Sequence, residues 1–199
     1  MTAAPPNVTD AARRMLDAAA EAFGSKGFHA TSTRDIAAGA GLSPAALYVY
    51  FPSKEDLLYT LSRTGHEEAL ALVTDAIASR SEPSAQLAEA IAQFTVWHVN
   101  HYALARVVYH EFPHLTPEHR EQLRSLRRSL DRALHQVLRA GMAGGDFEVD
   151  GVEDTTLALL SLVVDVARWY SPAVRRGTAQ IAQTNATLAL RMVGHRPGG

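Results

Sequence analysis

The amino-acid sequence predicts an all-α protein in which a small N-terminal helical module precedes a larger helical body. Apolar residues recur every three or four positions along most of the 199 residues, which is the spacing of one face of a helix. Strand-like alternation is confined to residues 146–150. Capping residues mark helix starts, and glycines and prolines mark helix ends.

Length and composition narrow the class of protein. A chain with 47% apolar and 20% charged residues suits one or two soluble domains with a hydrophobic core. The net charge of −2 excludes a polybasic coat for nucleic acid. The absence of cysteine excludes disulfides, thiolate zinc sites and a cysteine nucleophile.

The first residues lack a basic segment followed by an apolar stretch, so they do not resemble a secretory signal. The longest uncharged apolar run, between Asp154 and Asp165, is about half of the ~20 residues that a membrane span needs. We therefore expect a soluble, cytoplasmic protein with no membrane partner.

The spacing of helix breaks divides the chain into two parts. Three short helices are expected within the first fifty residues, followed by a long helix from about Lys54 and several helices of bundle length. This change in helix length predicts one domain over residues 1–53 and a second over residues 54–199. The helix from Lys54 joins them.

The module contains the pattern of a helix-turn-helix over residues 32–50. Ser32 caps a first helix, Gly41 permits a left-handed turn, and Ser43 caps a second helix with Pro44 at its first position. A short helix, a tight turn and a second short helix in this order predict a helix-turn-helix.

The second helix of this pattern is the candidate reader of DNA. Leu47 and Phe51 are expected to face the core, which turns the start of the helix outward, where a recognition helix enters the major groove. Free backbone N–H groups at helix starts suit phosphate oxygens. The candidate DNA contacts are Thr31, Ser32, Thr33, Arg34, Ser43, Pro44, Ala45, Ala46, Tyr48, Tyr50 and Lys54.

The charge of the module argues against strong binding by a single copy. Residues 1–60 hold five Lys or Arg and six Asp or Glu, a net charge of −1, where a DNA-binding domain usually carries a basic footprint. We therefore expect modest affinity and binding as a dimer. Spacing alone leaves DNA binding and purely structural helix packing equally open.

Four motifs in this module resemble the DNA-binding domain of TetR-family (TetR/AcrR-type) transcriptional regulators: Thr-Ser-Thr-Arg-Asp-Ile-Ala (31–37), Ala-Gly-Leu-Ser (40–43), Leu-Tyr-Val-Tyr-Phe (47–51) and Ser-Lys-Glu-Asp-Leu (53–57). The resemblance implies a homodimeric repressor that binds a palindromic double-stranded operator and is released by a small-molecule effector. It places residues 43–46 near bases and Tyr48 and Lys54 at phosphates. Ala45, Ala46 and Val49 depart from the family pattern, so base preferences do not carry over.

The helical body resembles one branch of the family more weakly, through Trp97, Tyr109-His110-Glu111, residues 116–120, Gly145-Asp146-Phe147 and Arg168-Trp169-Tyr170. Members of that branch often sense acyl-CoA thioesters from lipid or steroid catabolism. The resemblance therefore implies an effector of this class.

One helix of the body carries two imidazoles in an aromatic stripe. His98 and His101 fall on the same side as Phe94 and Trp97. The pattern fits two satisfied core histidines, and it also fits a buried small-molecule site in which aromatics surround a few polar groups. The candidate ligand-binding residues are Phe94, Trp97, His98, His101, Tyr102, Arg106, Tyr109, His110, Asp165 and Trp169.

Residues 110–114 match H-E-x-x-H, the metal-binding motif of zinc proteases. Pro113 disfavours helical geometry at Phe112, so His110 and His114 are not expected to share a helix face. We expect no metal, no cofactor and no enzymatic activity. A metal-dependent helical hydrolase using His110, Glu111 and His114 is the alternative function, and an adaptor bundle that docks protein is a third.

Two further helices have outward faces of a distinct character, one basic and one apolar. The helix from Pro117 turns several arginines outward, which fits a solvated face or an anion-binding rim. The helix over residues 155–170 is apolar nearly all round, so a monomer cannot easily cover it. Together with the helix over residues 178–193 it is the predicted interface of a two-fold homodimer.

Overall fold

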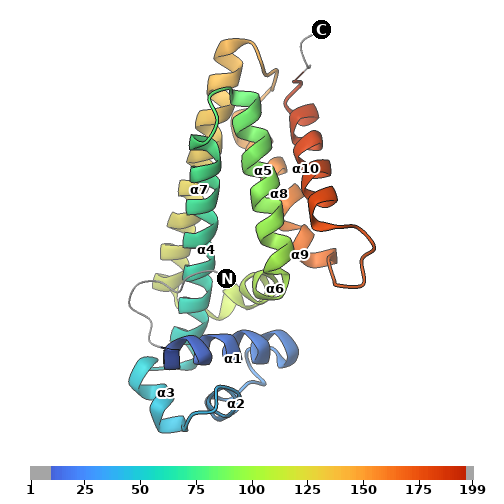
Figure 1. The fold of residues 1–199 in the computed structure, drawn as a ribbon. Coiled ribbons are helices and arrows are strands. Elements are labelled where there is room, and N and C mark those ends of the chain that lie inside the picture. Colours follow the sequence, from blue (N-terminus) through green and yellow to red (C-terminus); the bar gives the residue numbers. More distant parts are fainter. Residues whose placement is uncertain (1–9, 196–199) are drawn as a thin grey trace. The chain divides into compact units, whose positions relative to one another are not determined.

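The computed structural model describes residues 10–195, and every regular element in that range is helical (Figure 1). The elements are α1 (Asp10–Lys26), α2 (Thr33–Gly39), α3 (Pro44–Tyr50), α4 (Lys54–Ala78), α5 (Pro83–Asn100), α6 (Tyr102–Glu111), the 3-10 turn η1 (Phe112–His114), α7 (Pro117–Gly144), α8 (Val152–Val164), α9 (Val166–Trp169) and α10 (Thr178–Met192). The predicted all-α class is confirmed. Within the described range, no helix combines the length and the apolar character that a membrane crossing needs.

The described chain forms two compact units. The first comprises residues 10–66 together with Ala103–Leu123, and the second comprises Glu67–Tyr102 and residues 124–195. The long helices α4 and α7 each contribute to both units. The first unit thus joins the N-terminal module to α6 and to the start of α7, whereas the domain boundary at residue 53 stays a prediction.

The N-terminal helices begin where their caps predict. Ser32 Oγ accepts the Asp35 backbone N–H at 3.1 Å, and the Asp35 carboxylate accepts the Ser32 backbone N–H at 3.0 Å, which completes a capping box for α2. Ser43 Oγ accepts the Ala46 N–H at 3.2 Å at the start of α3. Gly41 has φ +67° in the turn between them, a conformation that favours glycine. The helix-turn-helix is therefore present.

The core of the N-terminal module consists of the apolar faces of α1, α2 and α3. These faces meet at buried side chains, which removes apolar surface from water and holds the three helices together. The buried residues are Met15, Leu16, Ala19, Phe23, Ile36 and Leu47.

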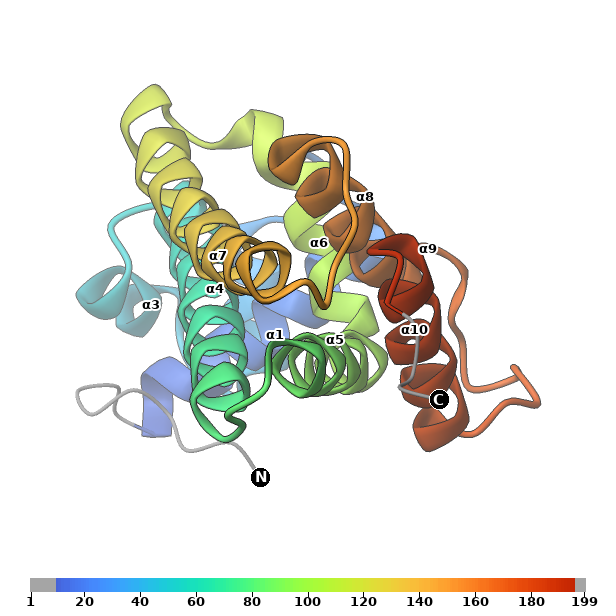
Figure 2. The same ribbon diagram turned by 90° about the horizontal axis from the view of Figure 1, so that it is seen from above.

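The second unit is built around α5. Seen from above, α10 lies beside α5, and α8 lies next to both (Figure 2). Its core includes Phe94, Leu134, Leu159 and Val163. Between α5 and α10, the buried Asn185 amide donates to Thr95 Oγ1 at 3.2 Å. This polar pair satisfies groups that would be costly to bury alone.

Two local expectations differ from the structure. Residues 146–150 form no strand, although the Glu148 N–H donates to the Val193 carbonyl at 2.8 Å. The helix expected over residues 155–170 is interrupted at Asp165 into α8 and α9. Aspartate favours helix starts over helix interiors, and here its carboxylate accepts Arg168 Nε at 2.6 Å in the first turn of α9.

We predict that Gly141→Ala in α7 destabilises the protein by about 1–3 kcal/mol, because its new methyl group would overlap the ring of the buried Phe147. Gly144→Ala in the same helix is the matched control. The nearest atom to a Cβ there is an Asp146 carboxylate oxygen at 3.7 Å, so this change should be neutral or slightly stabilising. Urea unfolding measures the stability of both variants. Equal free energies of unfolding would contradict the close packing of Gly141 against Phe147.

The capping box makes the stability of α2 depend on pH. The Ser32 backbone N–H and hydroxyl, together with the Lys26 ammonium, hold the pKa of Asp35 below its usual value of about 3.8. A carboxyl group with a lowered pKa in the folded state stabilises that state above its ordinary pKa, and this contribution is lost as the pH falls through the lowered value. Protonation therefore weakens the cap only in acid.

We expect Asp35→Asn to lower the free energy of unfolding at neutral pH, with the difference from wild type shrinking toward zero as the pH falls below about 3.8. Asp17→Asn on the exposed side of α1 controls for the change in net charge. Unfolding curves at several pH values test this, and a difference that stays constant in acid would rule out the carboxylate cap.

Candidate functional site

Helix α3 presents small and aromatic side chains to solvent. Ser43, Pro44 and Ala45 are exposed and Ala46 is half-buried, whereas Leu47 is fully buried. Further along, Tyr48 and Val49 are 54% and 78% exposed, and Tyr50 is also exposed. The predicted orientation of this helix is confirmed, with its start and its tyrosines outward.

The start of α2 supports this surface. The hydroxyl groups of Thr33 and Tyr48 lie 3.1 Å apart and share a hydrogen bond that joins α2 to α3. Ser32 and Arg34 are exposed beside them. Because Tyr48 is held by a neighbouring helix, its hydroxyl has a fixed position at the surface.

Thr31 is a correction to the predicted DNA contacts. Its side chain is 1% exposed, and its hydroxyl donates to the Gly27 and Ala22 carbonyls at 2.8 and 3.1 Å. A buried hydroxyl that already serves the end of α1 does not reach a phosphate. We therefore remove Thr31 from the DNA-binding set.

Lys54 has a structural role that the sequence did not indicate. Its ammonium group donates to the Phe28 carbonyl at 2.6 Å and to the Thr31 carbonyl at 2.8 Å, and it lies 4.3 Å above the Phe28 ring. These contacts fix the loop between α1 and α2 to the start of α4. Two of the three ammonium donors are thus occupied, which leaves one for DNA.

The end of α6 also holds the loop between α1 and α2. Glu111 Oε1 accepts the Phe28 backbone N–H at 3.1 Å, and Glu111 Oε2 lies 3.4 Å from His114 Nε2. The His114 ring stacks on Phe28 at 5.3 Å and meets the edge of His29 at 4.2 Å. The end of α6 and the loop between α1 and α2 are therefore hydrogen-bonded within the first unit.

A second link joins the starts of α4 and α7. The Glu55 carboxylate accepts the Thr116 backbone N–H at 2.8 Å and lies 2.9 Å from His119 Nδ1. The His119 ring stacks on Tyr59 at 3.7 Å. Sequence reasoning missed these contacts because they join residues about sixty positions apart.

The H-E-x-x-H match does not form a protease site. Helix α6 ends at Glu111, and Phe112–His114 forms a 3-10 turn, so His110 and His114 do not share a helix face. A different trio, Glu55, Asp56 and His119, has possible ligand atoms within 4.8 Å of one another. Its carboxylates already accept hydrogen bonds from Thr116 and Ser53 at helix starts, which accounts for their positions.

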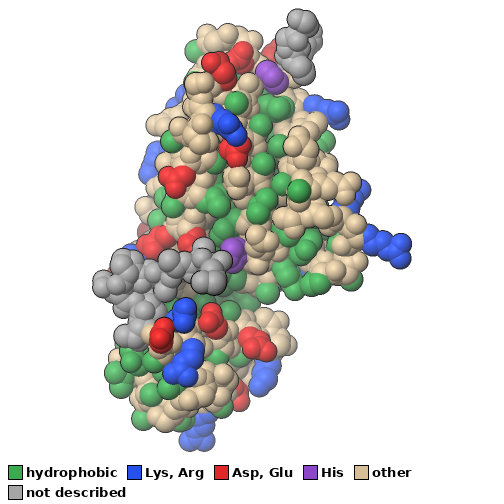
Figure 3. Space-filling view, viewed as in Figure 1, with side chains coloured by type: hydrophobic (Ala, Val, Ile, Leu, Met, Phe, Trp, Pro, Cys, Tyr) green, Lys and Arg blue, Asp and Glu red, His purple; other side chains and the backbone are tan. Residues whose placement is uncertain are grey.

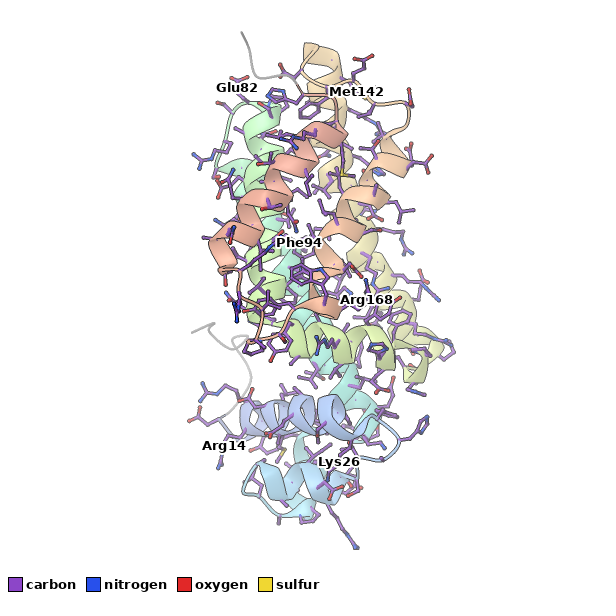
Figure 4. All side chains as sticks on the ribbon, turned by 90° about the vertical axis from the view of Figure 1, so that its right-hand side faces the viewer. Arg14, Lys26, Glu82, Phe94, Met142 and Arg168 are labelled. Carbon is purple, nitrogen blue, oxygen red and sulfur yellow. The ribbon has the colours of Figure 1, made fainter. Side chains whose placement is uncertain are left out.

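Part of the predicted ligand-binding set forms a buried aromatic cluster on α5. Phe94, Trp97 and His98 are buried, and Phe94 points from α5 into the body of the second unit (Figure 4). The Trp97 ring stacks on His101 at 4.7 Å and meets His98 edge-on at 5.1 Å. Tyr102, half-buried at the start of α6, meets Tyr170 at 5.4 Å.

The histidines of this cluster are bonded to their own helix. His98 Nδ1 lies 3.0 Å from the Phe94 carbonyl, and His101 Nδ1 lies 2.9 Å from the Trp97 carbonyl. A carbonyl oxygen only accepts, so each Nδ1 carries a proton and donates. This arrangement orients both rings.

Other predicted ligand-binding residues lie at the surface and are removed from the buried set. Tyr109 is 69% exposed and His110 is also exposed, and both belong to the first unit with the half-buried Arg106. Trp169 is 41% exposed. The exposed Asp165 is paired with Arg168, whose hydrogen bond lowers the pKa of that carboxyl group.

Apolar residues remain exposed on the helices predicted to form the dimer interface. Leu157 on α8 is 66% exposed, and further large apolar side chains are exposed on α8, α9 and α10. These are Val164, Trp169, Leu188 and Met192. The arginines of α7 from Arg124 to Arg132 are exposed as well, as a solvated face requires.

The space-filling view shows how charge is distributed. On the face shown, Lys and Arg side chains alternate with Asp and Glu over the N-terminal module, without a basic stripe (Figure 3). This matches the net charge of −1 over residues 1–60. Long-range attraction of DNA by this face is correspondingly weak.

Two family models match the chain: "Bacterial regulatory proteins, tetR family" over residues 15–60 and "Tetracyclin repressor-like, C-terminal domain" over residues 80–193. The transcriptional repressor KstR2 of Rhodococcus jostii is 30% identical over 161 residues, which cover 79% of this chain and 78% of the relative.

Solved structures share the fold. A TetR-family regulatory protein from Rhodococcus RHA1 is 37% identical with a TM-score of 0.90, covering 95% of this chain and all of that one. AibR, solved with isovaleryl coenzyme A and operator DNA, is 20% identical with a TM-score of 0.81, covering 90% of this chain and 97% of that one.

The relatives are regulators and nothing favours the hydrolase alternative. The helix-turn-helix, the exposed reading helix and the family matches lead to one conclusion. The chain belongs to the TetR family of transcriptional regulators, which are not enzymes, bind operator DNA as dimers and respond to small-molecule effectors.

Proposed function

We propose that the chain is a repressor that reads a dyad-symmetric operator through α3 and is released from it by a hydrophobic acyl compound. The observation that carries the DNA-binding part is the exposed start of α3, fixed by a buried core and by the hydrogen bond between Thr33 and Tyr48. A regulator of chromosomal operators acts in the cytoplasm, where we place this one.

The composition of α3 suggests how bases are read. Ala45 and Ala46 offer only methyl groups, and their plausible partners in a major groove are the methyl groups of thymine. Tyr48, Thr33 and Arg34 lie where phosphate contacts would position the helix. Such contacts raise affinity without reading sequence.

The buried aromatic cluster on α5 is the proposed effector site. It combines a large apolar surface with a few oriented polar groups, the usual lining of a small-molecule site. AibR is described with isovaleryl coenzyme A, and KstR2 is a repressor of related sequence. The AibR complex supports an acyl-CoA thioester as the effector class.

Chain continuity supplies a route from this site to DNA. One residue, His101, separates the end of α5 from the start of α6, and α6 ends at Glu111, which binds the Phe28 backbone. An effector that shifts the end of α5 would move α6, and with it the loop that carries the helix-turn-helix. A changed spacing of two recognition helices in a dimer would then no longer match a rigid operator.

We predict that replacing thymine by uracil at half-site positions of a selected operator weakens binding, because the methyl groups facing Ala45 and Ala46 are lost. Uracil placed between the half-sites serves as the control and should have little effect. Fluorescence anisotropy at fixed salt measures the affinity. Indifference to uracil at every half-site position would argue against this docking of α3.

We expect Leu157→Asp to separate the dimer, because interfaces of obligate dimers commonly bury ~2,000 Å² or more and tolerate no unpaired charge at an apolar position. Leu157 is 66% exposed in one chain, so folding of the chain should survive. Ser125→Asp on the exposed side of α7 is the control. If Leu157→Asp sediments as a stable dimer, the interface lies elsewhere.

A further inference from the structure

The indole N–H of Trp97 is a buried donor without an acceptor. The side chain is 8% exposed, and its Nε1 finds no hydrogen-bond partner among the residues that the structure describes. Indole can only donate, so no rearrangement of protons satisfies it. Leaving such a group unpaired is costly, and native proteins rarely do so without a reason.

The indole ring is held in one orientation. His101 stacks on it at 4.7 Å, His98 meets it edge-on at 5.1 Å, and Phe94 lies 6.4 Å away. The hydrogen bond from His101 to the Trp97 carbonyl fixes the stacking partner in turn. The N–H is therefore directed in advance and cannot easily turn toward another acceptor.

Apart from the two histidine rings, whose Nδ1 atoms are bonded to backbone carbonyls, the surroundings of the indole are apolar. Trp97 belongs to the core cluster that contains Leu159 and Val163 of α8 and Phe94 of α5. A single oriented donor in an apolar site is complementary to a ligand with an apolar body and one uncharged acceptor. A carboxylate would also accept, but burying its charge here is much more costly than burying a carbonyl group.

We propose that the Trp97 Nε1–H donates a hydrogen bond to an uncharged carbonyl oxygen of the effector. This inference rests on the proposed function and makes it more specific, because it assigns the carbonyl group, rather than the acyl chain alone, as the recognised feature. Thioesters, esters and ketones satisfy it. Free fatty acids and thioethers do not.

The test compares octanoyl-CoA with S-octyl-CoA, a thioether in which a methylene group replaces the carbonyl. Wild-type protein should bind the thioester about tenfold more tightly, since the thioether leaves the indole N–H unpaired. In Trp97→Phe, which keeps an aromatic ring without the donor, the two affinities should become equal. Butyryl- and palmitoyl-CoA and their thioethers cover other chain lengths.

Thr156→Val is the matched control. Thr156 is 2% exposed on α8, and its hydroxyl also lacks a partner among the described residues. This variant should keep the wild-type preference for the thioester. If Trp97→Phe retains the preference, the assignment to Trp97 is wrong, whatever Thr156→Val does.

Proton NMR gives a second readout that does not depend on the folding of Trp97→Phe. The chain has two tryptophans, and the indole signal that Trp169→Phe removes is assigned to Trp169, so the other signal, followed in the wild-type protein, belongs to Trp97. Octanoyl-CoA should shift that signal downfield and S-octyl-CoA should not. Equal shifts with both ligands would overturn the inference.

Failure of the inference differs from failure of the proposed function. If none of the thioesters binds or weakens operator binding, the proposed effector class is wrong, and the inference falls with it. If thioesters release the operator but thioethers do so equally well, the proposed function stands and the role of the Trp97 N–H is refuted.

Discussion

The loop between α1 and α2 depends on two charged side chains that satisfy its backbone. The Lys54 ammonium holds the Phe28 and Thr31 carbonyls, and the Glu111 carboxylate holds the Phe28 N–H. Charged groups make stronger hydrogen bonds than neutral ones, and removing either partner would leave peptide groups unpaired. The helix-turn-helix follows directly after this loop, so its position relative to α4 and α6 is set by these bonds.

This constraint gives α6 a double role. It follows α5, which carries the buried aromatic cluster, after a break in helical geometry at His101, and its last residue, Glu111, binds the loop that precedes the helix-turn-helix. A helix is stiff along its axis, so a displacement at Tyr102 would reach Glu111, about 13.5 Å away, with little loss. In the route that we propose, the response to an effector needs no contact between the ligand and the DNA-binding residues, only a shift of one short helix.

The sequence predicted the N-terminal module well. Its helix caps, the turn at Gly41 and the buried face of α3 each depend on residues that are close together in the sequence. Long-range pairs were not predictable, since no periodicity relates Glu111 to Phe28. The error at Tyr109 has a specific cause. At His101 the backbone leaves helical geometry, with φ −119° and ψ 26°, so a helical wheel drawn through α5 no longer describes α6.

The small net charge of the N-terminal module bears on how its DNA binding would be controlled. With a net charge of −1 over residues 1–60, one module gains little from phosphate attraction, and tight binding requires both modules of a dimer on one duplex. Coupling between an effector and DNA is typically 1–3 kcal/mol, or 5- to 150-fold in affinity. A basic module would keep non-specific affinity after such a loss, whereas this one retains little to hold it on DNA.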